Sequence, residues 1–102
     1  MENLAVLILQ KALENGLGRK NLNASTVHGG YLFFQLKSVM YAVNIETLNV
    51  FRNVPNDESH AIELYPNETS MLIQRYLKSQ LNTSSVIDKL TKEICVERGI
   101  KL

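Results

Sequence analysis

The chain has 102 residues, of which 45% are hydrophobic and 21% charged, and its formal net charge at pH 7 is +1. This length is typical of one domain, so we predict a single domain over residues 1–102 with one hydrophobic core. The composition excludes a disordered tail and a collagen-like repeat, and the near-neutral charge gives no overall attraction to nucleic acid or to an anionic membrane. The single cysteine, Cys95, cannot close an internal disulfide, which excludes a disulfide-stapled secreted mini-protein.

The N-terminal residues lack the pattern of an export signal. Met1–Asn3 contains no Lys or Arg, and the apolar run that follows covers only Leu4–Leu9. A signal peptide has a basic start and a longer apolar stretch, and a membrane-spanning helix needs about 20 apolar residues. We therefore expect a cytoplasmic chain that has no membrane partner.

The first predicted element is a helix over Glu2–Asn15. Its apolar residues cover a wide arc at helical spacing, which favours a helix that is buried on most of its circumference; they include Leu4, Leu7, Ile8, Leu9, Ala12 and Leu13. Gly16 fits a left-handed cap at the end of this helix. The alternative is a strand over Leu4–Leu9, but no turn residue ends that run.

From Ser25 to Tyr65 the apolar period changes from 3.6 to 2, which predicts strands. Gly29–Gly30 fits the tight turn of a hairpin, because glycine adopts positive φ without strain. The aromatic and aliphatic segment Tyr31–Leu36 predicts a strand that is buried on both faces. After a polar break at Lys37–Ser38, one set of alternating residues predicts a strand with one face inward, namely Val39, Tyr41, Val43 and Ile45.

The same alternation continues through Leu48, Val50 and Val54. The segment Pro55–Ser59 has the composition of a loop, and Ala61–Tyr65 predicts a further short strand. These consecutive strands predict an antiparallel meander with three to four strands.

The last third of the sequence returns to helical periodicity. Asn67 or Thr69 can cap a helix that runs to about Leu81, with its apolar positions at Leu72, Ile73, Tyr76, Leu77 and Leu81. Ser85 and Asp88 approximate the capping box of a final helix, which has a stripe of Ile87, Leu90 and Ile94 and a cap at Gly99. The order of elements predicts an α+β domain with an N-terminal helix, the meander, and two C-terminal helices packed on the sheet.

The residues of common catalytic and cofactor sites are missing or scattered. The glycines do not form a phosphate-binding loop, and the only His and Cys residues, His28, His60 and Cys95, lie far apart in the sequence. Cys95 also falls in the middle of a predicted helix between two apolar residues, whereas a reactive thiolate favours a helix N-terminus or a cationic neighbourhood. We therefore predict no enzyme activity, no metal and no cofactor. An enzyme remains an alternative only if these three side chains converge in space.

Charge is distributed unevenly along the chain. Residues 31–68 are acidic and residues 69–102 are basic. Four cations of the basic part are the candidate partner-binding residues: Arg75, Lys78, Lys89 and Lys92. Lys89 and Lys92 have acidic residues four positions away, Glu93 and Asp88, which favours local ion pairs.

These observations predict a small non-enzymatic protein-interaction module, of an accessory or inhibitory and neutralising kind. An open antiparallel sheet has two edges that recruit other chains, so the partner is another protein or a second copy in a homodimer. The alternative is a nucleic-acid-binding regulator that uses the basic residues of the C-terminal helices. The net charge of +1 argues against it, because phosphate contacts dominate affinity for nucleic acid.

Overall fold

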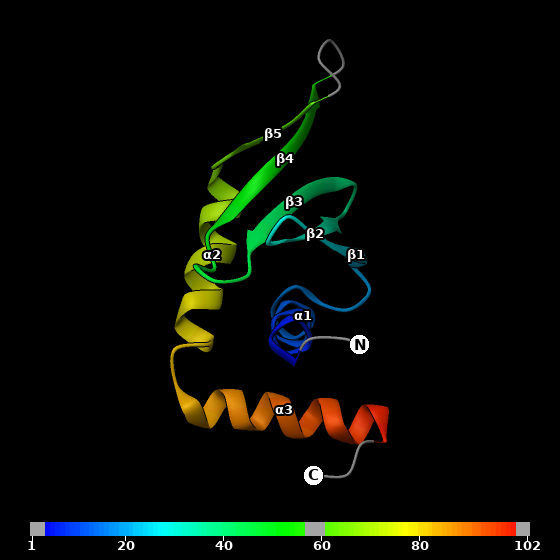
Figure 1. Cartoon of the computed structure of the whole chain (residues 1–102), viewed down its shortest axis with the longest axis vertical. Coiled ribbons are helices and arrows are strands. Elements are labelled where there is room, and N and C mark those ends of the chain that lie inside the picture. The colour runs from blue at the N-terminus through cyan, green and yellow to red at the C-terminus, as the bar shows by residue number, and fades with distance from the viewer. Residues whose placement is uncertain (1–3, 57–60, 100–102) are drawn as a thin grey trace.

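The computed structural model describes residues 4–56 and 61–99 (Figure 1). The elements in chain order are α1 (Leu4–Leu17), β1 (Leu22–His28), β2 (Tyr31–Leu36), β3 (Val39–Asn44), β4 (Val50–Asn56), β5 (Ala61–Tyr65), α2 (Glu68–Gln80) and α3 (Ser84–Arg98). This order confirms the predicted α+β class, with one N-terminal helix, a run of strands and two C-terminal helices. The first predicted helical residues and most of the loop predicted before Ala61 lie outside the described residues.

The strands form one five-stranded antiparallel sheet in the order β1-β2-β3-β4-β5. The meander is as predicted, but the count of three to four strands was too low. The alternation through Leu48 hid a turn: Leu48 has a left-handed backbone with φ of 65°, and its N–H donates to the carbonyl of Asn44 at 2.8 Å. The side chain of Asn44 also accepts from the N–H groups of Glu46 and Thr47 at 2.9 and 3.0 Å. Asn44 thus folds the chain back and separates β3 from β4.

Two tight turns close the hairpins of the first three strands. Gly29 and Gly30 have φ of 58° and 80°, as predicted, which is the two-residue turn whose twist matches a hairpin. The polar break at Lys37 and Ser38 is a second turn of this kind, since both residues also have positive φ, 53° and 81°. No glycine marks this turn, so composition alone did not reveal it as a hairpin.

The end of α1 differs from the prediction. The helix continues to Leu17, and the left-handed residue after it is Gly18, with φ of 87°, whose N–H donates to the Glu14 carbonyl at 3.0 Å. Gly16 lies inside the helix. The ring of Tyr76 packs directly on it, so that a Cβ at Gly16 would overlap two of the ring carbons. Burial raises the pKa of the Tyr76 hydroxyl. Gly16 therefore serves the contact between α1 and α2.

The helices begin and end largely through local contacts. Asn67 caps α2, because its side chain accepts from the N–H of Ser70 at 2.7 Å and the Ser70 hydroxyl accepts from the N–H of Asn67 at 2.8 Å. The capping box predicted at Ser85 is absent, since α3 begins at Ser84 after Thr83 and no side chain caps it. Gly99 ends α3 with φ of 68°, as predicted.

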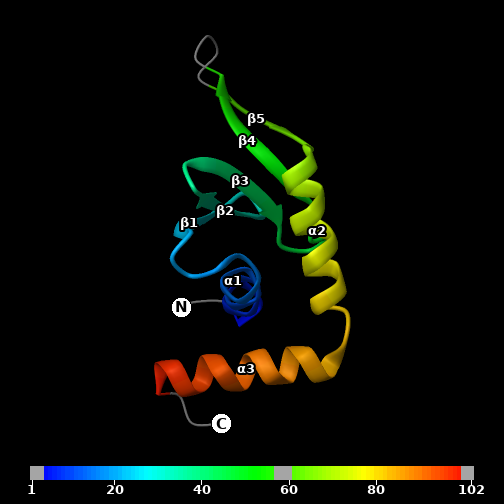
Figure 2. The same cartoon turned by 180° about the vertical axis from the view of Figure 1, so that it is seen from behind.

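One face of the sheet, the inner face, packs against α1 and α2 (Figures 1 and 2). The buried residues of this core are Leu9, Ala12, Leu13, Leu32, Phe34, Tyr41, Val43, Val50, Ile73, Leu77 and Leu90. The inward side predicted for β3 is thus confirmed at Tyr41 and Val43. Leu72, which was predicted on the apolar side of α2, is 57% exposed.

The third helix does not pack on the sheet as predicted. It contacts mainly α1, which lies between α3 and the strands (Figures 1 and 2). The inner face is already occupied, by α1 near β1 and by α2 along β4. Leu90 is therefore buried, at 5% exposure, in a second helical layer.

We predict that Leu90→Ala lowers the free energy of unfolding by about 2–5 kcal/mol, because it leaves a cavity between packed helices. Val96→Ala is the matched control on the same helix, since Val96 is 83% exposed, and we expect a change within about 0.5 kcal/mol. Urea denaturation followed by circular dichroism measures both. A loss below about 1 kcal/mol for Leu90→Ala would show that α3 is not docked.

We also predict that Gly16→Ala destabilises the protein by about 1–3 kcal/mol, because the new methyl group overpacks the Tyr76 ring. Alanine inside a helix is otherwise favoured over glycine by about 1 kcal/mol. In a Tyr76→Ala background the ring is gone, and the same substitution is expected to become stabilising. Thermal melts of the four proteins in this cycle measure the change of sign, and a stabilising effect in both backgrounds would contradict the contact.

Candidate interaction surfaces

The predicted cations of α2 are both exposed, but they have different surroundings. Arg75 lies on the solvent side of the helix. The Nζ of Lys78 donates to the side chain of Asn49 at 2.7 Å, on the turn between β3 and β4. Lys78 therefore has a structural contact that the sequence did not reveal, and it is less available to a partner than Arg75.

The predicted cations of α3 are also exposed, and they lie elsewhere. Lys89 lines a small hollow together with Tyr76 and Gln80 of α2. At 3.6 residues per turn, these two residues lie on the opposite side of α2 from Lys78. The four predicted cations thus do not share one surface. Among the described residues, neither of the two predicted pairs, Asp88–Lys92 and Lys89–Glu93, is an ion pair. Partner binding by these cations stays a prediction.

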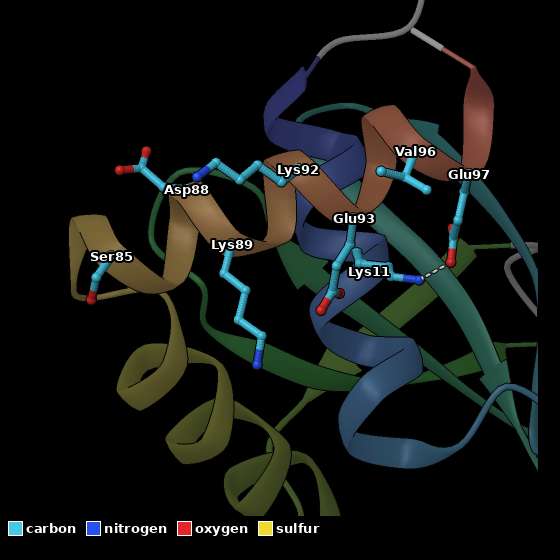
Figure 3. A pocket seen from close by; sticks show the side chains of 8 residues that line it. All are labelled: Lys11, Ser85, Asp88, Lys89, Lys92, Glu93, Val96 and Glu97. Atoms are coloured by element: carbon cyan, nitrogen blue, oxygen red, sulfur yellow. Dashed lines mark hydrogen bonds and ion pairs between the residues drawn. The ribbon is translucent and has the colours of Figure 1, made fainter. Parts of the chain in front are cut away.

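A shallow hollow of about 710 Å³ runs along the outer side of α3 (Figure 3). It is lined by Lys11, Ser85, Asp88, Lys89, Lys92, Glu93, Val96 and Glu97. Acidic and basic side chains alternate along it, and Lys11 of α1 forms an ion pair with Glu97. Because both signs of charge are equally represented, the hollow favours neither an anion nor a cation.

The side chains that could carry catalysis or bind a metal do not meet in the described part of the chain. His28 is exposed at the end of β1, whereas Cys95 is buried on α3, in the layer beyond α1. His60 lies outside the described residues. Over residues 4–56 and 61–99, no group of three His, Cys, Asp or Glu side chains is close enough to hold a metal ion.

The sheet face opposite the helices carries an apolar surface that the sequence did not reveal. Strand alternation places six apolar residues there, which we name the outer sheet face: Tyr31, Phe33, Met40, Ala42, Phe51 and Leu64. None of them belongs to the core cluster or packs against it. The strand Tyr31–Leu36, which was predicted to be buried on both faces, is fully buried only at Leu32 and Phe34. None of the three described helices covers its other face (Figures 1 and 2).

Three aromatic rings pack together at the centre of this face. The ring of Tyr31 lies 6.3 Å from that of Phe33 and 6.5 Å, edge-on, from that of Phe51. Phe33 and Phe51 are the register partners of Ala42 on its two sides. The rings therefore close over the small side chain of Ala42, which is completely buried.

The outer sheet face carries no formal charge among the described strand positions whose side chains the structure defines. The positions around the six apolar residues are Asn23, Thr26, His28, Gln35, Asn44 and Asn53. None of the twelve is Lys, Arg, Asp or Glu, although such residues make up 21% of the chain. The Oδ1 atom of Asn53 is buried and has no hydrogen-bond partner within the described part of the chain.

Periodicity could not reveal this face, because both sets of residues in β2 are apolar. Which set is covered depends on where the helices dock, and that is a long-range property. The sequence feature that could have indicated this face is the lack of charged residues over Tyr31–Leu36 and Val39–Ile45. Lys37 is charged but lies in the turn between these two segments.

Comparison of the chain with models of protein families, with curated proteins and with solved structures finds no match. Among the described residues, no helix combines the length and the apolar character needed to cross a bilayer. The function is therefore inferred from the surfaces themselves.

The ion pair between Lys11 and Glu97 gives a pH-dependent prediction. The hydrogen bond from Lys11 is the main cause that lowers the pKa of Glu97. A carboxyl whose pKa is lower in the folded state stabilises the protein above its unfolded pKa, and this contribution is lost as the pH falls through the folded pKa. We predict that Glu97→Gln is less stable than the wild type at neutral pH and that the two converge in acid.

Thermal unfolding from neutral pH to about pH 3 measures this difference. Asp88→Asn is the control, since Asp88 lies in the same hollow and makes no ion pair in the described part of the chain. A Glu97→Gln deficit that persists unchanged at the lowest pH would contradict the assignment.

Proposed function

We propose that this chain is a small non-enzymatic protein-interaction module whose outer sheet face binds a partner protein. The observation that carries the proposal is an uncovered sheet face with an aromatic centre and no formal charge. Contiguous apolar surface with a polar rim marks a binding site on a soluble protein. Tyr, Phe and Met, the residues at the centre of this face, are enriched in the cores of protein interfaces.

The shape of the surface supports an accessory or inhibitory role. A sheet face is broad, so it covers an area of the partner instead of entering a narrow cleft. The chain would act by occupying that area. The lone free thiol, Cys95, is buried, which suits a reducing compartment, and we place the module in the cytoplasm.

A protein suits this face better than nucleic acid does. Phosphate contacts supply most of the affinity for nucleic acid and need Lys or Arg, and the described positions of the outer sheet face have neither. The exposed cations Arg75, Lys89 and Lys92 lie on the helices, whose layers are on the other side of the sheet. In this proposal they steer an acidic partner and change the rate of association more than the affinity.

Capture of partners by the immobilised chain from cell extract tests the proposal. We expect Phe33→Glu to reduce the retention of the bound protein more than tenfold, because it places a charge at the centre of the face. Ser79→Glu, which places the same charge at an exposed position of α2, should retain the same protein as the wild type. Circular dichroism and thermal melts verify that both variants fold.

Equal retention by the wild type and by Phe33→Glu would place binding elsewhere on the chain. No specific protein retained by the wild type would also count against a partner-binding module.

A further inference from the structure

We infer that the small pocket between α1, α2 and α3 is a binding site for a free α-amino acid with an apolar side chain. This pocket, which we name the helix junction pocket, has a volume of about 220 Å³. It lies among the helices, away from the outer sheet face, so the inference goes beyond the proposed function. It is carried by a separated pair of opposite charges, by polar groups without partners, and by an apolar wall.

The helix junction pocket contains one cation and one anion that do not pair with each other. Lys89 and Glu93 are one turn apart on α3, and both line the pocket. Figure 3 shows that their side chains leave the helix on the side where α1 and α2 lie. Opposite charges at this spacing commonly pair, yet these two form no ion pair, and Lys89 has no hydrogen-bond partner in the described part of the chain. The charge of Lys89 is therefore available to a ligand.

Neutral polar side chains surround the two charges. The amide of Asn15 donates to Glu93 at 3.4 Å, a length at which a hydrogen bond is weak, so Glu93 can accept a stronger donor. Tyr76 and Gln80 of α2 line the same pocket, and neither side chain has a hydrogen-bond partner within the described residues. An amide and a hydroxyl can each donate and accept, so they can bind either end of a ligand that carries both charges.

The separated charges select a zwitterion. A ligand with only a carboxylate pairs with Lys89 but also lies near the carboxylate of Glu93, and a ligand with only an ammonium group has the reverse conflict. Like charges placed close together in a binding site reduce affinity. An α-amino acid carries both groups on one carbon, so its carboxylate can pair with Lys89 while its ammonium group donates to Glu93. Such charge-assisted hydrogen bonds are stronger than neutral ones.

Apolar side chains supply the rest of the wall. Ala12 and Leu90 are buried and Val86 is half-buried, and all three line the pocket together with Tyr76. This wall favours an aliphatic ligand side chain over a polar one. The volume of about 220 Å³ is below the range of about 300–1,000 Å³ that is typical of sites for drug-sized ligands. A single amino acid therefore suits the pocket, whereas a nucleotide is too large.

NMR titration of the isotope-labelled full chain with L-leucine and L-valine tests the site. We expect saturable shifts of the backbone amides of Asn15, Gln80 and Glu93, with a dissociation constant below about 1 mM. The melting temperature should rise with ligand concentration, because the ligand binds only the folded chain. The absence of saturable shifts with both amino acids up to about 10 mM overturns the inference.

Two analogues of leucine test the recognition of both charges. The first, 4-methylpentanoate, lacks the ammonium group, and the second, leucinamide, lacks the carboxylate. Each is expected to bind at least tenfold more weakly than L-leucine. An analogue that binds as tightly as L-leucine would show that the pocket does not select a zwitterion, which also overturns the inference.

Two variants test the assigned residues. Lys89→Gln and Glu93→Gln each remove one charge and should raise the dissociation constant for L-leucine at least tenfold. Their matched controls on α3 are Lys92→Gln and Asp88→Asn, because these residues do not line the helix junction pocket, and both controls should bind as the wild type does. Circular dichroism verifies that all four variants fold. A pocket variant that binds L-leucine as tightly as its control places the ligand elsewhere and overturns the inference.

Discussion

The structure depends on the burial of α1 between the sheet and α3. Its residues Leu9, Ala12 and Leu13 are at most 2% exposed, which a helix reaches only when neighbours contact it on more than one side. On one side lies the inner face of the sheet, and on the other lies α3. Because α1 occupies that position, α3 packs on α1 instead of on the sheet, and none of the described helices lies on the opposite face. The uncovered outer sheet face thus follows from the same packing that forms the core.

A second constraint fixes α2 against the turn between β3 and β4. The N–H of Val50, a fully buried residue, donates to the side chain of Gln74 at 3.0 Å, and Lys78 binds Asn49 one residue earlier. The strained backbone of Leu48 lies in this turn, and its side chain packs against the core. A left-handed leucine costs roughly 1–2 kcal/mol, which packing and these hydrogen bonds offset. Lys78 therefore has a structural role, because its side chain binds the turn between β3 and β4.

Local chemistry made most of the elements predictable, whereas their packing was not. The turn at Gly29–Gly30, the cap at Asn67 and the end of α3 at Gly99 depend on residues close in sequence. The turn and the end of α3 are as predicted, and Asn67 is one of the two caps predicted for α2. Gly16 was misread because its role is set by Tyr76, a residue far along the chain. The position of α3 and the exposure of β2 on one face likewise depend on which helices pack on the sheet. The outer sheet face likewise depends on packing between distant parts of the chain, so the sequence did not reveal it.

The charged residues of β4 and β5 show that the bare outer sheet face is not a general property of the strands. Where these strands project beyond the helices (Figures 1 and 2), the side that continues the inner face carries Arg52 and Glu63, both exposed. Uncovered strand positions on that side thus have the charges that keep a sheet soluble and discourage association. The outer sheet face is equally without a helix, yet over its described positions it has aromatic rings and amides instead. Over their described positions, these two strands therefore carry charged, exposed side chains on one side and uncharged, partly buried side chains (Phe51, Asn53 and Leu64) on the other.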